Sequence, residues 1–131
     1  MTFLLVSVAG GIGCMLRFGL SALFEKHNPL GFPIATAAIN ILGAFLLGLL
    51  TAVAADIMGL SELKAILGVG LLGGFTTFSA ASVEAAQLVL GQGSRTTRSQ
   101  PSAVRVLKGA GLAATMLLLA VAAGALGLVL G

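Results

Sequence analysis

Charged residues are rare in this chain and divide it into long apolar stretches. Only seven basic and four acidic side chains occur in 131 residues. The apolar stretches cover about 3–24, 32–55, 64–90 and 104–130, each near the ~20 residues that a helix needs to cross the hydrocarbon core of a bilayer. The pattern predicts an all-α membrane protein with four transmembrane helices. Since nothing is left over for a soluble part, residues 1–131 are expected to form a single transmembrane domain.

Composition strengthens this interpretation. The chain is 58% hydrophobic and 8% charged, with a mean hydropathy of +1.13. A soluble domain of this size could not bury so much apolar surface, so lipid is expected to be the solvent. The N-terminal stretch lacks a basic leading region and is interrupted by glycines and Arg17, which favours a first span over a signal peptide. The net charge of +3 is too dispersed to indicate nucleic-acid binding.

The loops carry their positive charge unevenly. Four spans place both termini and the 56–63 loop on one side of the membrane, where Lys64 is the basic residue. Positive loops stay in the cytoplasm, so both termini of this multi-pass cell-membrane protein are predicted to face outward. The basic residues on the opposite side are Lys26, Arg95, Arg98, Arg105 and Lys108.

The third apolar stretch contains a sequence that does not favour a continuous helix. Residues 73–79 read Gly-Gly-Phe-Thr-Thr-Phe-Ser, with paired glycines and paired β-branched residues, both poor helix formers. At membrane depth, backbone leaves the helix only where it is buried in protein or lines a polar cavity. The sequence therefore predicts a break in the third helix, and such a break indicates a binding or permeation site.

Two charged residues lie well inside the spans. A charge there costs at least ~2.5–3.5 kcal/mol on insertion scales, so each needs an explanation. Arg17 either extends towards the basic side or faces a wet vestibule or a buried acid, and Glu84 lies at a depth that permits pairing with it. Small residues at Gly10, Gly11 and Gly13 should let a neighbouring helix approach the first span closely.

Polar residues in the second span share one helix face. Thr36 and Asn40 are four residues apart. An uncharged amide with two N–H donors suits brief contact with a small anion, but asparagine also holds membrane helices together, and both roles stay open. Neither a metal-ligand cluster nor a nucleophile–base pair is apparent, so an enzyme is not expected. Cys14 is expected to be a small packing residue.

These motifs together resemble those of the Fluc/CrcB family of small fluoride channels. The resemblance runs through G-G-x-G-x-x-x-R from Gly10, P-x-x-T-x-x-x-N-x-x-G-x-F-x-x-G from Pro33, and G-G-F-T-T-F-S-x-x-S-x-E from Gly73. It implies a two-subunit channel with antiparallel subunits, which exports fluoride passively and lowers its cytoplasmic concentration. By the same resemblance, a structural Na⁺ at the dimer interface is bound by the backbone carbonyls of Gly73 and Thr76. The implied fluoride pathway contains Asn40, Phe78, Thr36, Ser79, Glu84 and Arg17.

The chain also departs from the family pattern. Ala81 stands where the family has a second pore phenylalanine, and Ala80 replaces the hydroxyl residue before it. The biased loop charges indicate one fixed orientation, whereas many single-gene members have balanced charges. Both features favour a heterodimer with an oppositely oriented paralogue over a homodimer.

Two alternative functions remain open at this stage. One is a non-conducting structural subunit that completes a paralogue's pore. The other is a small multidrug-type proton antiporter, which requires a membrane-buried glutamate in the first span and aromatic residues around its cation. This chain has Arg17 in that span and contains no Trp or Tyr.

Overall fold

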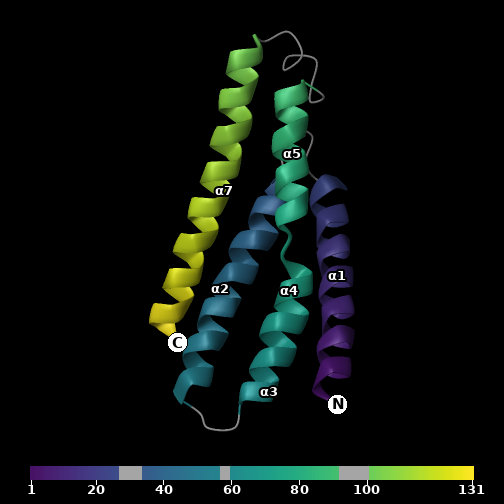
Figure 1. Cartoon of the computed structure of the whole chain (residues 1–131), viewed down its shortest axis with the longest axis vertical. Helices are drawn as coiled ribbons and strands as arrows, with labels where there is room; N and C mark the ends of the chain where they lie inside the picture. Colours follow the sequence, from purple (N-terminus) through teal and green to yellow (C-terminus); the bar gives the residue numbers. More distant parts are fainter. Residues whose placement is uncertain (27–33, 57–59, 92–100) are drawn as a thin grey trace.

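The computed structural model of the protein describes residues 1–26, 34–56, 60–91 and 101–131. These residues form four helical crossings that run alternately up and down the molecule (Figure 1). The first, second and fourth crossings are the continuous helices α1 (Thr2–Lys26), α2 (Ile34–Asp56) and α7 (Ser102–Leu130). The third consists of α3 (Ser61–Lys64), the π-helix η1 (Ala65–Leu72), α4 (Gly73–Phe75) and α5 (Phe78–Leu90).

The predicted transmembrane architecture is confirmed. The described residues contain four helical segments long and apolar enough to cross a membrane: Thr2–Phe24, Ile34–Ala55, Ser61–Leu90 and Ser102–Leu130. Their bounds lie within a few residues of the spans expected from the distribution of charges. The all-α fold class therefore follows from the length and spacing of the apolar stretches alone.

The third crossing is interrupted where the sequence predicts a break. Thr76 has φ −77° and ψ 155°, and Thr77 has φ −150° and ψ 115°, so both residues are extended. Helical geometry stops after Phe75 and resumes at Phe78. The π-helix before the break was not expected from the sequence.

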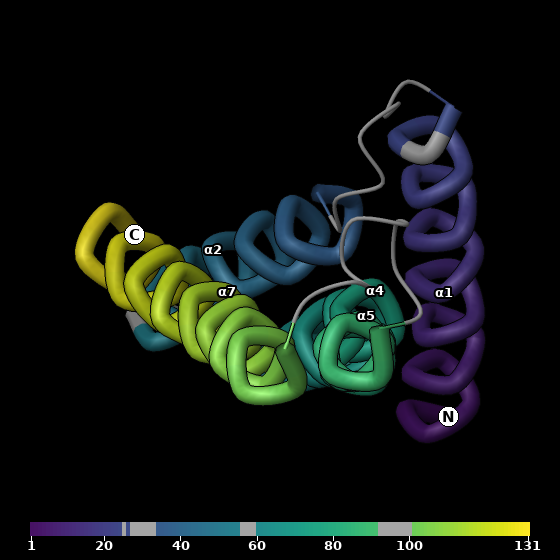
Figure 2. The backbone as a smooth tube through the Cα atoms, turned by 90° about the horizontal axis from the view of Figure 1, so that it is seen from above, coloured from purple at the N-terminus to yellow at the C-terminus, as the bar shows by residue number. Residues whose placement is uncertain are grey.

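The break divides the third crossing into two halves with different neighbours. Its first half, η1 and α4, packs on α1, whereas its second half, α5, packs on α7 (Figure 2). Helix α2 packs mainly along α7. The extended residues Thr76 and Thr77 therefore lie where the third crossing passes from one neighbour to the other.

Glycines bring α1 close to the third crossing. A methyl group at Gly13 would overlap the carbonyl oxygen of Leu71, and one at Gly74 would overlap the carbonyl oxygen of Gly10. The predicted close approach of the first span is thus confirmed at Gly10 and Gly13. By contrast, nothing lies within 4 Å of a methyl group placed at Gly11.

Glycines also bring α2 and α7 close together. A methyl group at Gly48 would overlap the carbonyl oxygen of Gly124, and one at Gly127 would overlap that of Phe45. Small residues let backbones approach closely, which is how membrane helices gain packing energy without a hydrophobic driving force.

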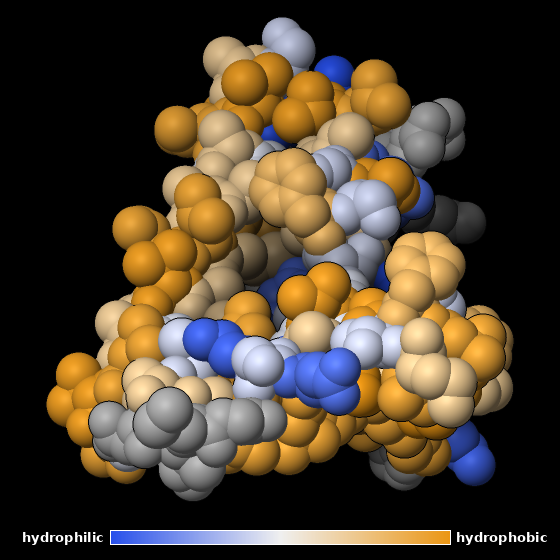
Figure 3. Space-filling model, turned by 60° about the horizontal axis from the view of Figure 1, so that its bottom comes forward, coloured by the Kyte–Doolittle hydropathy of each residue, from blue (hydrophilic) through white to orange (hydrophobic). Residues whose placement is uncertain are grey.

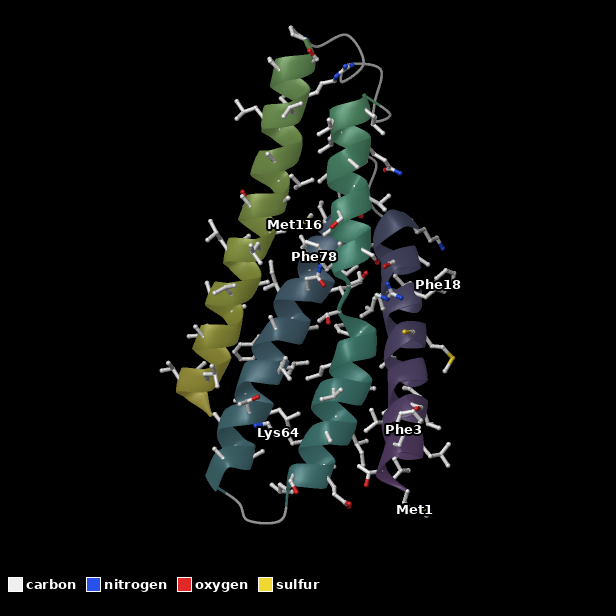
Figure 4. The ribbon with its side chains drawn as sticks, in the orientation of Figure 1. Met1, Phe3, Phe18, Lys64, Phe78 and Met116 are labelled. Carbon is white, nitrogen blue, oxygen red and sulfur yellow. The ribbon has the colours of Figure 1, made fainter. Side chains whose placement is uncertain are left out.

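The single chain buries few of its large apolar side chains. Among the described residues, Ile39 is the one large side chain below 2% exposure. Phe3 and Phe18 on α1 are 86% and 77% exposed and are labelled in Figure 4. Such surface must be covered by lipid or by another protein chain.

The two ends of the molecule differ in charge. Both termini lie at the end where α2 leads to α3 (Figure 1), and Lys64 is also at this end. Lys26 ends α1 at the opposite end, where Arg105 and Lys108 lie in the first turns of α7. Arg95 and Arg98, which the sequence also assigns to that end, are outside the described residues.

Candidate functional site: a broken helix beside an open groove

Two threonines form the break, and each completes one half of the interrupted helix. The Thr76 N–H donates to the carbonyl oxygen of Leu72 at 2.9 Å, and the Thr76 hydroxyl donates to the same oxygen at 3.0 Å. The Thr77 hydroxyl accepts a bond from the Ala80 N–H at 3.3 Å and so caps the N-terminus of α5. Thr76 thus closes the first half-helix and Thr77 begins the second.

Asn40 of α2 bonds to the backbone at the break from the side. Its Nδ2 donates to the Thr77 carbonyl oxygen at 2.9 Å, and its Oδ1 accepts from the Thr77 N–H at 2.8 Å. The orientation of the amide follows from this pairing, because a backbone N–H can only donate and a carbonyl can only accept. The sequence left two roles open for Asn40. The structure gives it the role of linking helices and leaves one of its two N–H groups for other partners.

The pairing changes the hydrogen bonding of Gly73. In a continuous helix the Thr77 N–H would donate to the Gly73 carbonyl, four residues earlier. Here the Thr77 N–H bonds to Asn40, so the Gly73 carbonyl loses its helical donor. Gly73 is exposed, and its backbone lines a groove between α2, the third crossing and α7.

The break faces an open groove of about 320 Å³ between α2, the third crossing and α7. A second hollow of about 390 Å³ continues along α2 and α7 and shares Ala44, Leu47 and Ala120 with it. Seen with the lower end of the molecule turned forward, the surface is hollowed, and hydrophilic residues are visible inside the hollow and on part of its otherwise hydrophobic rim (Figure 3). Of the residues predicted for the site, Asn40, Gly73, Thr76 and Phe78 line the 320 Å³ groove.

Phe78 is the first residue of α5 and is 80% exposed. Figure 4 labels it close to Met116 of α7, and both residues line the groove. Ala81, one turn later, lines the same groove and is 8% exposed. Because the Phe78 side chain is so exposed, the faces and the edge of its ring are accessible to any ion or protein chain that enters the groove.

Thr36 and Glu84 bond to each other, and neither lines the 320 Å³ groove. The Thr36 hydroxyl donates to Glu84 Oε1 at 2.6 Å, and Thr36 is 5% exposed. The sequence predicted both as parts of one polar pathway, and the structure brings them into direct contact although 48 residues separate them. The hydrogen bond gives this half-buried carboxylate a partner within the protein.

Arg17 lies near this pair. It lines a cavity of about 160 Å³ together with Thr36, Thr77 and Ala80. Its Nε atom is buried and has no hydrogen-bond partner among the described residues. Arg17 thus faces a cavity beside the break, and both its vestibule role and its ion pair with Glu84 stay predictions.

Thr77 is the residue that sequence reasoning undervalued. It lines both the 320 Å³ groove and the 160 Å³ cavity, so it separates the two spaces. Its hydroxyl also lies 3.0 Å from that of Ser79, which is exposed at the start of α5. The paired threonines of the motif could have indicated its importance. Which side of the third crossing each threonine faces, however, depends on the geometry of the break.

The described residues contain no group of three His, Cys, Asp or Glu side chains that could bind a metal ion. A cation at this site would therefore be bound by backbone or hydroxyl oxygens, and oxygen ligands suit hard cations. The Cys14 thiol donates to the Gly74 carbonyl at 3.3 Å, but Cys14 is exposed in the single chain, so its packing role stays a prediction.

Comparison with known proteins identifies relatives along almost the whole chain. The family described as CrcB-like protein, Camphor Resistance (CrcB), matches residues 4–131. A protein of Leifsonia xyli subsp. xyli named Fluoride-specific ion channel FluC 1 is 41% identical over 128 residues, covering 98% of this chain and 85% of that protein. Fluoride-specific ion channel FluC 2 of Cutibacterium acnes is 47% identical over 96 residues, covering 72% and 78%. Fluoride-specific ion channel FluC of Thermus thermophilus is 43% identical over 89 residues, covering 68% and 71%.

Proposed function

The chain belongs to the CrcB-like family, and we propose that it is a subunit of a fluoride-specific channel that exports fluoride passively and lowers its cytoplasmic concentration. The observation that carries this proposal is the interrupted third crossing, which presents Phe78 and the Asn40 amide on one groove. The family consists of channels rather than enzymes, and membership excludes the antiporter alternative.

The proposed fluoride pathway uses weak, non-titrating donors. Fluoride holds its water tightly, so a pore must replace that water without binding the ion too strongly to release it. The free N–H of Asn40 and the positive edge of the Phe78 ring meet this requirement. The hydroxyls of Thr36 and Ser79, the carboxylate of Glu84 and the Arg17 guanidinium extend the pathway across the break, which is supported by the two cavities that meet at Thr77.

We propose that the groove is completed by a second subunit packed antiparallel to the first. Three features support this: the groove is open, its lining is mostly apolar, and Phe78 is 80% exposed on it. Lipid would cover apolar surface equally well but would leave the polar groups of the break in hydrocarbon, which is costly. A protein partner can pair with those groups.

The residues at the break fit a structural Na⁺. The Gly73 carbonyl has lost its helical donor, and Thr76, the last residue of the first half-helix, lines the same groove. When bound, the ion would supply positive charge that satisfies carbonyl oxygens from both subunits. Its role would be to join the subunits rather than to move.

Several features favour a heterodimer with a paralogue. Ala81 leaves the groove without the second phenylalanine of the family pattern, so two copies of this chain would lack that ring in both pathways. The basic end of the molecule also favours one orientation, with both termini outside the cell. A protease site appended after Gly131 should be cut from outside intact cells, and cleavage only after lysis would reverse this orientation.

Replacement of Phe78 tests whether this chain is a conducting subunit or a non-conducting structural one. If the ring edge contributes as much as an aromatic pair, roughly 0.5–1.5 kcal/mol, Phe78→Ile should slow fluoride efflux from vesicles by about two- to tenfold. The matched control is Phe3→Ile, which changes an equally exposed phenylalanine far from the groove and should leave efflux unchanged. Equal efflux from both variants would support the structural subunit instead.

A further inference from the structure

Asn40 lies where α2 crosses the break, and its position is set by the residues around it. Thr36, Asn40 and Gly43 share one face of α2, and each contacts a different part of the third crossing. Thr36 bonds to Glu84 in α5, and Asn40 bonds to Thr77 in the break. Gly43 is buried, and a methyl group there would overlap the Thr76 Cγ2 atom.

Both of Asn40's bonds go to the backbone of Thr77. This two-way pairing resembles the exchange of N–H and C=O bonds between neighbouring strands, and it matches the extended conformation of Thr77. A residue with one polar atom could satisfy only one side of Thr77. An amide satisfies both and still has one N–H left.

From this geometry we infer that Asn40 is a positioning residue: its side chain holds the third crossing open by replacing the helical partners of Thr77. The pairing takes the Thr77 N–H away from the Gly73 carbonyl, and α5 then starts one residue later with Phe78 directed at the groove. The hydrogen bonds that hold the break are therefore all made within the single chain. The effect of Asn40 on sodium binding rests on the proposed function, whereas its positioning role at the break does not.

The test is hydrogen exchange at the Thr77 amide, measured by NMR on the full chain in lipid. A protected amide exchanges when its hydrogen bond opens, so loss of the acceptor should accelerate exchange in Asn40→Ala by about tenfold or more. Asn40→Asp keeps an acceptor oxygen and should stay closer to the wild type. Thr36→Val, one turn away on the same face, should leave the Thr77 amide unchanged.

The inference is overturned if Thr77 exchanges in Asn40→Ala at the wild-type rate. Should the alanine variant not be recovered folded, Asn40→Ser provides the same comparison, since its shorter side chain cannot meet both atoms of Thr77. Acceleration in the serine variant supports the inference, and wild-type exchange there contradicts it.

A second measurement separates this inference from the proposed sodium site. The concentration of NaCl that protects the dimer half-maximally against heating should rise several-fold in Asn40→Ala, because the loosened Thr77 backbone no longer fixes the carbonyl oxygens beside it. Phe78→Ile should leave it unchanged, as Phe78 lies beyond the break. Faster Thr77 exchange without any sodium dependence would contradict the sodium proposal and leave the positioning role supported.

Discussion

Gly11 and Gly13 lie two residues apart on α1 and have opposite surroundings. Gly13 is buried against the third crossing, whereas Gly11 is exposed. The sequence marked both as small residues for close packing, together with Gly10. The two glycines differ because Gly13 lies on the face of α1 that contacts the third crossing and Gly11 does not. Which face makes that contact depends on tertiary packing rather than on the local motif.

Gly13→Ala is expected to destabilise the protein strongly. The added methyl group meets the carbonyl oxygen of Leu71, a backbone atom that cannot move aside, so α1 must shift at a cost of about 1–3 kcal/mol. Gly11→Ala is the matched control and should be neutral or stabilising by up to about 1 kcal/mol, because alanine forms helix better than glycine. Denaturant titration in detergent measures both, and equal stability of the two variants would contradict the packing.

Single-residue roles were predictable only in part. The spacing of Thr36 and Asn40 placed them on one face of the second span, but their partners, Glu84 and the Thr77 backbone, lie dozens of residues away. Periodicity reports which residues share a face and says nothing of what that face meets. The family pattern identified Asn40 as important, whereas its bonds to Thr77 became visible only in the structure.

At the scale of helices, the break was predictable and its surroundings were not. Paired glycines and threonines within an apolar stretch indicated the interruption. The π-helix η1 was not predictable in this way, nor was its close packing on α1, where a methyl group at Gly70 would lie 2.7 Å from the carbonyl oxygen of Val6. Such contacts join residues far apart in sequence, and no local pattern encodes them.

Thr77→Val should loosen the start of α5 without removing the break. The valine has the same shape but cannot accept the Ala80 N–H, and loss of an N-cap costs about 1 kcal/mol, or roughly fivefold faster exchange of the Ala80 amide. Thr77→Ser keeps the hydroxyl and should exchange at nearly the wild-type rate. Unchanged exchange at Ala80 in Thr77→Val would show that the cap contributes little.

At the scale of the whole molecule, the single chain leaves much of its apolar surface uncovered. It buries few large side chains and presents an open groove with Phe78 on its wall and the Gly73 backbone nearby. The sequence predicted the need for a second subunit through its resemblance to known channels. Composition alone could not have done so, because lipid and protein cover apolar surface equally well.

Fluoride efflux from reconstituted vesicles tests the central claim most directly. Vesicles containing this chain and an oppositely oriented four-span paralogue should release fluoride rapidly and retain chloride. The chain alone should release much less, because two copies lack the second phenylalanine and share one orientation preference. Fluoride release from the pair no faster than from protein-free vesicles would contradict the account, and rapid release by the chain alone would replace the heterodimer with a homodimer.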